Sequence, residues 1–204
     1  MMAWSGWIRG GGAMLAMFLS LCPLALAAVQ PMDLLLFPKT VVDRAIEARS
    51  MADIAKDNEI ILKVNGLMAE VGTIKASTRI YEQRLLVTGL FDDKETYDEF
   101  EKAVRAIKDV KTLYWHAIYM PKAEQERRKL LDWGDVIVLE TKAEARLIGA
   151  SGVADVNFRV AGDAFGTLYL LGRARSQPER SKALARARDG GKVKKLVDYI
   201  ELRP

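Results

Sequence analysis

The chain has 204 residues, of which 50% are apolar and 28% are charged, with a formal net charge of +4. This length and composition suit a soluble globular protein of one or two domains. The single cysteine, Cys22, lies near the N-terminus. If that end is removed, the mature chain has no cysteine, which excludes disulfides, thiol catalysis and cysteine-ligated zinc.

The N-terminal segment has the features of a secretory signal peptide. Residues 1–12 carry one positive charge, Arg9, and no acid, and the apolar run GAMLAMFLSLCPLALAA follows. Residues 25–27, Ala-Leu-Ala, give the small-x-small pattern that precedes a signal peptidase site. The run is short for a membrane span, which needs about 20 residues. We predict that residues 1–27 are removed and that the protein is exported, in a bacterium to the periplasm.

Two alternatives remain open for this segment. It could stay uncleaved as a signal anchor, or Cys22 could be lipidated, because residues 19–22 faintly resemble a lipobox. Lipoprotein processing requires a small residue before the cysteine, and Leu21 is not small. We therefore expect no lipid anchor. No other segment of the sequence is apolar enough to span a membrane.

A leader is predicted over residues 28–56, either as a helix or as a flexible tether. It contains the apolar patch Leu34–Phe37, which Pro38 ends. The stretch TVVDRAIEARSMADIAKDN that follows mixes charge and alanine with little clear periodicity.

The first structural unit is predicted over residues 57–121, in the order helix, strand, strand, helix, strand. Apolar residues with helical spacing begin at Ile60, and Gly72 can end that helix. The strands TIKASTRI and RLLVTGL flank the short turn YEQ. Asp92-Asp93 is a typical helix start, and VKTLYWHAIYM is the third strand, which ends at Pro121.

After a charged linker at residues 122–134, the same order is predicted again over residues 135–204. VIVLETKAEARLI is a helix, although its first four residues could pass for a strand. DVNFRV and TLYLLGR are strands on either side of AGDAFG, a turn three residues longer than its counterpart. Ser176 and Pro178 open the second helix, Gly190-Gly191 closes it, and VKKLVDYIEL is the last strand.

The two units are predicted to be copies of one structure. DVKTLYWHAIYMP at residues 109–121 matches KVKKLVDYIELRP at residues 192–204, and the offset of 83 extends back to the second strand without a gap. Upstream of the turn the predicted offset is 80, an even shift that places Ile80 and Val160 on the same inward face. A period near 80 indicates a domain duplication. The predicted fold class is α+β, with two tandem αββαβ domains, each a three-stranded mixed sheet with two helices on one face.

This order of elements resembles the BON domain (bacterial OsmY and nodulation). Both units end the second strand with a glycine element, at Gly89 and Gly172, and begin the last strand with Val-Lys, at Val110 and Val193. The resemblance covers residues 57–204. With two such units, the chain is similar to the dual-BON periplasmic and outer-membrane lipoproteins of Gram-negative bacteria. It implies interaction with phospholipid membranes and a role in outer-membrane integrity or osmotic-stress tolerance, and it implies no enzymatic activity.

Few residues are suited to catalysis or to cofactor binding. The single histidine, His116, lies within a strand pattern and is predicted to be a sheet residue rather than a metal ligand or general base. Asp92-Asp93 are predicted to cap a helix. The sequence has no glycine-rich phosphate loop and no evident base for a nucleophilic serine. We predict that the protein is not an enzyme and that it holds no metal or cofactor.

Charge distinguishes the two units. Residues 28–128 have a net charge of −1, and residues 129–204 have a net charge of +4. Residues 173–195 alone carry +7, and the matching helix of the first unit is acidic. A solvated face usually mixes signs, so we predict that this run binds anionic phospholipid, at about 1 kcal/mol for each cation that reaches the membrane surface. The predicted lipid-binding residues are Arg173, Arg175, Arg180, Lys182, Arg186, Arg188, Lys192, Lys194 and Lys195.

The expected function is that of a non-enzymatic periplasmic protein that is peripheral at a membrane, expected to be the outer membrane. The alternatives are a chaperone-like module that docks envelope proteins through the basic run, and a small-molecule or ion-binding domain. Nucleic acid is not an expected partner, because the chain is exported and no aromatic platform accompanies the cations. Trp115 is expected in a strand, and Trp133 either between the domains or at a membrane.

Overall fold

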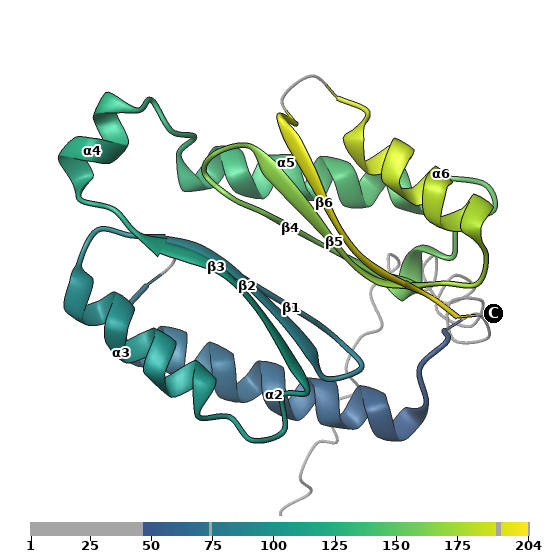
Figure 1. Cartoon of the computed structure of the whole chain (residues 1–204), viewed down its shortest axis with the longest axis horizontal. Coiled ribbons are helices and arrows are strands. Elements are labelled where there is room, and N and C mark those ends of the chain that lie inside the picture. The colour runs from purple at the N-terminus through teal and green to yellow at the C-terminus, as the bar shows by residue number, and fades with distance from the viewer. Residues whose placement is uncertain (1–46, 74, 191–192, 204) are drawn as a thin grey trace, which may run out of the picture.

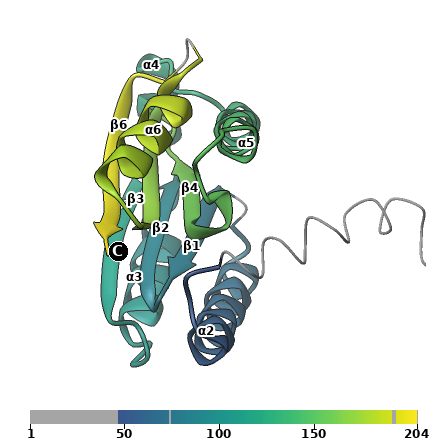
Figure 2. The same cartoon turned by 90° about the vertical axis from the view of Figure 1, so that its right-hand side faces the viewer.

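The computed structural model describes residues 47–73, 75–190 and 193–203. The predicted signal peptide and its alternatives, together with residues 28–46 of the predicted leader, lie outside the described residues. The described part is an α+β protein in four layers: a pair of helices, a three-stranded sheet, a second three-stranded sheet and another pair of helices (Figures 1 and 2).

The first unit has the predicted order of helix, strand, strand, helix, strand. Its elements are α2 (Met51–Glu70), β1 (Ala76–Tyr81), β2 (Arg84–Phe91), α3 (Lys94–Arg105) and β3 (Thr112–Tyr119). β1 and β2 are antiparallel and β2 and β3 are parallel, so the sheet is mixed, as predicted. The Ser50 side chain caps α2 by accepting a hydrogen bond from the Asp53 N–H. Residues 51–56 of the predicted leader therefore belong to the helix.

The second unit repeats this order after one additional short helix. Its elements are α4 (Lys122–Arg127), α5 (Trp133–Ile148), the 3-10 turn η1 (Asp155–Asn157), β4 (Phe158–Gly162), β5 (Thr167–Ala174), α6 (Gln177–Arg188) and β6 (Lys195–Leu202). α4 occupies part of the predicted linker, and Asp132 caps α5 at Trp133. The predicted strand DVNFRV was too early at its start. Because the Asn157 N–H bonds the Ala154 carbonyl within a turn, Val156 lies before the strand.

The later elements of the two units correspond at one constant offset, and the earlier ones do not. α3 and α6 lie 83 residues apart, as do β3 and β6, as predicted. In the first strands, Ala76 pairs with Gly89 and Phe158 pairs with Gly172, so their offset is 82 rather than the predicted 80. Ile80 and Val160 both face a core because the shift is still even, but they are not equivalent positions.

The glycine element marks a close approach between the second strand and the chain that leads into the first. A Cβ atom at Gly89 would lie 3.1 Å from the carbonyl oxygen of Lys75, and one at Gly172 would overlap the carbonyl oxygen of Asn157. Glycine is required at Gly172, whereas a side chain at Gly89 would force its neighbours to shift by a few tenths of an ångström. The two valines predicted with this motif, Val110 and Val193, pack against the cores of their own units.

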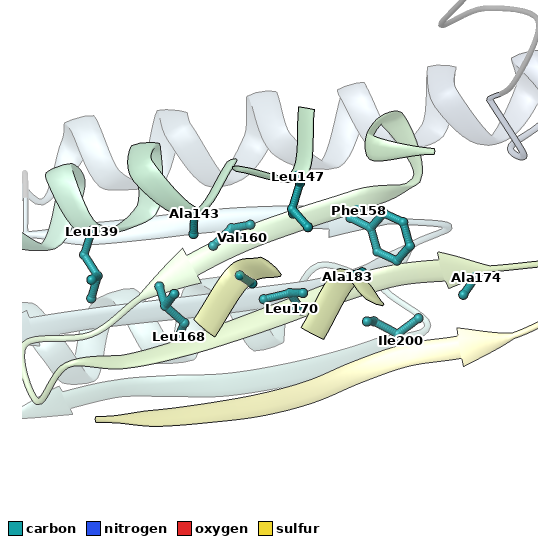
Figure 3. Packing of buried hydrophobic residues seen from close by; sticks show 11 residues of the cluster. Leu139, Ala143, Leu147, Phe158, Val160, Leu168, Leu170, Ala174, Ala183 and Ile200 are labelled. Carbon is teal, nitrogen blue, oxygen red and sulfur yellow. The ribbon is translucent and has the colours of Figure 1, made fainter. Parts of the chain in front are cut away.

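Each unit has an apolar core between its sheet and its helices. Figure 3 shows the core of the second unit, where α5, α6 and the three strands all contribute side chains. Its buried members include Leu139, Ala143, Leu147, Phe158, Val160, Leu168, Leu170, Ala174, Ala183 and Ile200. In the first unit, Phe100 of α3 stacks on Phe91 and packs against Trp115, which lies in β3 as predicted.

A further apolar cluster lies between the two sheets, which pack face to face. Tyr81 and Leu86 of the first unit meet Ala161, Tyr169 and Leu171 of the second. β2 is consequently buried along its whole length, because α2 and α3 cover one side of it and the second sheet covers the other.

Two arginines fasten the sheets to each other. Arg84 of β2 donates hydrogen bonds to the carbonyl oxygens of Gly172 (2.7 Å) and Tyr199 (3.1 Å) in the second unit. Arg79 of β1 donates to the Val160 carbonyl (2.7 Å) and pairs with the carboxylate of Glu140 at 2.9 Å. Burial raises the pKa of Glu140, and the nearby Arg79 charge opposes that rise.

Candidate membrane-binding surface

The nine cations of the predicted lipid-binding run fall into two groups. Arg173, Arg175, Arg180 and Lys182 each have a partner within the protein. Four others are exposed and, within the described residues, have neither an ion pair nor a side-chain hydrogen bond. These are Arg186, Arg188, Lys194 and Lys195, which we call the open cations. Lys192 lies outside the described residues.

The partnered cations hold elements together. Arg180 of α6 donates to the carboxylate of Asp198 in β6, with N–O distances of 2.7 and 2.9 Å. Arg173 is only 21% exposed and lies 3.7 Å from the Glu82 carboxylate, at the contact between the units. Arg180 and Arg173 are therefore poorly placed to reach a membrane, because carboxylates already compensate their charge, whereas Lys182 bonds only the Ser151 carbonyl and Arg175 remains 57% exposed.

The open cations gather where α6 passes into β6 (Figure 1). Ala183 and Ala187 are fully buried against the sheet, which turns the arginines of the last turn of α6 outward. Lys194 and Lys195 follow at the start of β6, and the Lys194 N–H bonds the Gly166 carbonyl in the turn before β5. One end of the second unit therefore presents positive charge with no acid paired to it among the described residues.

At the equivalent end of the first unit, the arginine that matches Arg188 is neutralised, although Lys102, Lys108 and Lys111 are exposed there without an ion pair among the described residues. Arg105 of α3 corresponds to Arg188 at the offset of 83, and its guanidinium bonds the Glu101 carboxylate at 2.6 and 2.9 Å. In the second unit Leu184 stands where Glu101 would be. The replacement of one acid by leucine leaves Arg188 open.

α5 adds a feature that the sequence interpretation missed. Ile137, Val138 and Ile148 are 50%, 47% and 56% exposed, although they are large and apolar. The signal was the run Val136 to Leu139, because a helix can direct only part of four consecutive residues to its core. α5 and α6 share the outer layer, and the Arg146 guanidinium of α5 donates to the Ala187 carbonyl of α6 at 3.1 Å. Arg146 therefore ties α5 to the end of α6 that carries the open cations.

The tryptophan of the linker is involved in packing between the units. Trp133, the first residue of α5, packs against a cluster that joins Leu90 and Met120 of the first unit to Val136 and Ala164 of the second. Of the two places expected for it, the position between the units is the one it occupies.

His116 lies in β3, as expected, and faces the second sheet. Its Nε2 lies 2.8 Å from the hydroxyl oxygen of Tyr199, and its ring packs on Tyr169 at a centroid distance of 4.3 Å. Burial lowers the pKa of His116, and the charge of Lys195 lowers it further while that of Asp163 opposes them. Burial likewise raises the pKa of Tyr81 in the same contact to about 12. These groups form a tightly packed interface between the sheets.

Within residues 47–73, 75–190 and 193–203, no three His, Cys, Asp or Glu side chains are grouped so that they could hold a metal ion. In the same part of the chain, no helix combines the length and the apolar character that a membrane crossing requires.

Comparison with known proteins gives distant similarities. No family model matches the chain. A protein of Anaplasma centrale, described as an uncharacterized protein in the gshII 5′ region, is 25% identical over 149 residues, which cover 72% of this chain and 95% of that protein. Two solved structures of CdsD, a structural protein of the Type III secretion system of Chlamydia trachomatis, match 72% and 71% of this chain and 93% and 98% of theirs. They are 10% and 12% identical with TM-scores of 0.29 and 0.30, which are too low to support an inference about fold or function.

Proposed function

We propose that this chain is a non-enzymatic, periplasmic protein of the BON-domain type that binds anionic phospholipid surfaces through its second unit and supports outer-membrane integrity or osmotic-stress tolerance. The observation that carries the proposal is the set of open cations at the α6–β6 end, three of which have no open equivalent in the first unit, whereas Lys194 corresponds to the exposed Lys111. Arg186 corresponds to Ala103 and Lys195 to Thr112. The difference is concentrated at one surface of one unit, as expected for a binding surface.

The energetics favour a combined contact of charge and apolar side chains. Four cations at about 1 kcal/mol each give about 4 kcal/mol, which corresponds to a dissociation constant near 1 mM. The exposed side chains of α5 would add about 1 kcal/mol each if the acyl boundary covered their exposed halves. The sum of about 7 kcal/mol corresponds to a dissociation constant of roughly 10 µM. Binding of this kind is peripheral and weakens with salt, because salt screens the exposed charges.

The test is co-sedimentation of the predicted mature chain, residues 28–204, with vesicles of zwitterionic lipid alone or with about a third of anionic lipid. We expect sedimentation only with anionic vesicles and its loss at high salt. Reversal of charge at Arg188 and Lys194 to Glu should abolish it, whereas the same change at the equivalent Arg105 and Lys111 should not. Equal losses from both pairs of substitutions would contradict the assignment to the second unit.

A second candidate function rests on the same apolar side chains of α5, which would also suit an envelope protein as partner. In that case, neither vesicle would sediment the protein. Substitution of Ile137 and Ile148 by Glu would then abolish capture of an envelope protein by the mature chain, while reversal of the open cations would have less effect.

A further inference from the structure

A groove of about 630 Å³ runs between α2 and α3, on the side of the molecule opposite to α5 and α6 (Figure 1). Small and apolar residues form most of its lining, including Gly66 and Leu67 of α2 and Ala103, Ala106 and Ile107 around the end of α3. This surface is separate from the open cations and has no part in the proposed lipid contact.

The groove presents a protruding side chain next to an empty space. Leu62 is 71% exposed, the highest exposure among the large apolar residues described. Gly66 follows one helical turn later on the same face, and a Cβ atom placed there would meet no atom within 4 Å. Glycine in a helix interior is about 1 kcal/mol less favourable than alanine, so nothing within this unit explains its presence.

The corresponding space in the second unit is filled. Arg146 of α5 crosses to the C-terminal end of α6, where it bonds the Ala187 carbonyl at 3.1 Å. A Cβ atom at Gly190 would collide with the same guanidinium. The space between the helices is therefore closed by a polar side chain in the second unit and left apolar and open in the first.

The charges at the rim of the groove balance one another. Lys63 and Asp109 form an exposed pair at 3.0 Å across it, and Lys108 and Glu70 also line it. Two cations and two carboxylates around an apolar floor do not favour a strongly charged partner. They suit a surface with the same pattern of charges, which a second copy of the chain supplies.

We propose that the α2–α3 groove is a self-association surface on which two copies of the protein pack around a two-fold axis. Leu62 of each copy inserts above Gly66 of the other, which the spacing of one helical turn allows in an isologous contact. The lining residues of α2, Leu62 to Glu70, span roughly 12 Å from the helix rise, and a width of about 20 Å gives about 250 Å² on each copy. This is far below the roughly 800 Å² of a stable complex, so the dimer should be weak, with a dissociation constant on the order of 1 mM.

The test is sedimentation velocity of the mature chain without lipid, from about 5 µM to about 500 µM, a range whose upper end approaches this affinity. We expect the weight-average sedimentation coefficient to equal that of a monomer at the lowest concentration and to rise above it at the highest. Leu62→Glu should keep the protein monomeric throughout the range. Gly66→Gln should do the same while raising the melting temperature, because it removes the open space and a helical glycine.

Two control variants make the result specific. Met51 lies on the same helix and is 68% exposed outside the groove, so Met51→Glu should dimerise like the wild type. Ile137→Glu, on α5, should also dimerise normally. A wild type that stays monomeric at the highest concentration overturns the proposal, as does loss of the dimer in Ile137→Glu but not in Leu62→Glu. None of these results depends on whether the second unit binds lipid.

Discussion

In the first unit, a side chain of helix α2 stabilises the turn between β1 and β2 by hydrogen bonds. In the second unit, a side chain within the turn between β4 and β5 does so. Glu82 and Gln83 have positive φ angles of 53° and 62°, which is unfavourable for non-glycine residues. Asp57 of α2 accepts hydrogen bonds from both of their N–H groups, at 2.9 and 2.7 Å, and also pairs with Arg49. The turn therefore depends on a side chain that lies 25 residues earlier in the chain.

The second unit uses a local arrangement instead. Asp163, within the turn, accepts from the N–H groups of Phe165 and Thr167 and from the hydroxyl group of Tyr169. By the match of buried positions, the equivalent of Asp57 in α5 is Val136, which only packs. The two units thus stabilise equivalent turns in different ways. They have diverged in the side chains that hold the turn and not in the order of the backbone elements.

The largest expected effect comes from removing the hydrogen bonds between Asp57 and the β1–β2 turn of the first unit. Asp57→Ala would remove one of the two carboxylate partners of Arg49, leaving Glu47, and would leave two buried N–H groups without an acceptor, so we expect a loss of about 3–5 kcal/mol in the free energy of unfolding. Chemical denaturation measures it. Asp163→Ala, the comparison variant, should cost about 1–3 kcal/mol because it removes only local bonds. An equal or larger loss in Asp163→Ala would refute the contrast.

Next in size is the removal of Arg84, which joins the two units. Arg84→Ala takes away two charged donors from carbonyl groups of the second sheet, and we expect a loss of about 2–3 kcal/mol. Thermal unfolding should show it, together with faster proteolysis of the exposed segment at residues 127–129. Lys94→Ala, which breaks only the exposed pair with Asp98, should leave the melting temperature almost unchanged.

A smaller effect is expected from making the first unit resemble the second. Glu101→Leu reproduces the Leu184 and Arg188 arrangement and frees Arg105. Affinity for anionic vesicles should rise about fivefold, from about 1 kcal/mol for one released cation. Glu99→Leu removes the same charge without releasing an arginine and serves as the matched control. A rise of the same size in Glu99→Leu would mean that net charge, rather than an unpaired cation, sets the affinity.

The smallest effect is a pH dependence at the contact between the sheets. Because the pKa of folded His116 is below its ordinary value of 6.5, the unfolded state binds more protons near and below that value. The contribution of this group is therefore present above pH 6.5 and declines as the pH falls below it. The melting temperature of His116→Gln should lie further below that of the wild type at pH 7.5 than at pH 5. If the gap between the two melting temperatures does not change with pH, His116 is not the source of the pH dependence.

The order of elements and the duplication could be predicted because they rest on local patterns. Asp93 and Ser176 both cap their helices as expected, and the last strands match at the expected offset. The offset of the first strands was wrong because β4 extends to Gly162, so that in the register of the strands the second turn is one residue longer than the first rather than three. The short turn at Glu82 lacks the asparagine or glycine that usually marks such turns, since the helix compensates for it.

The packing of the two sheets against each other was not predicted, although the sequence contains a signal for it. Strands with helices on one side and water on the other alternate in polarity, but RLLVTGL and TLYLLG are almost continuously apolar. The candidate surface was predicted too broadly for a related reason. Whether an arginine is open depends on partners such as Asp198 and Glu82, which are distant in the chain and come close only in the folded molecule.

The way in which the sheets meet also bears on what the linker does. β1 contacts β5 and β2 contacts β4 reciprocally, and His116 touches Tyr199, the residue at its own equivalent position. This reciprocity is the geometry of two identical subunits around a two-fold axis, here joined in one polypeptide. The specificity of the contact then resides in the sheets. The connecting segment supplies a high effective concentration, which lets one half change its outer surface while the other half keeps the pair together.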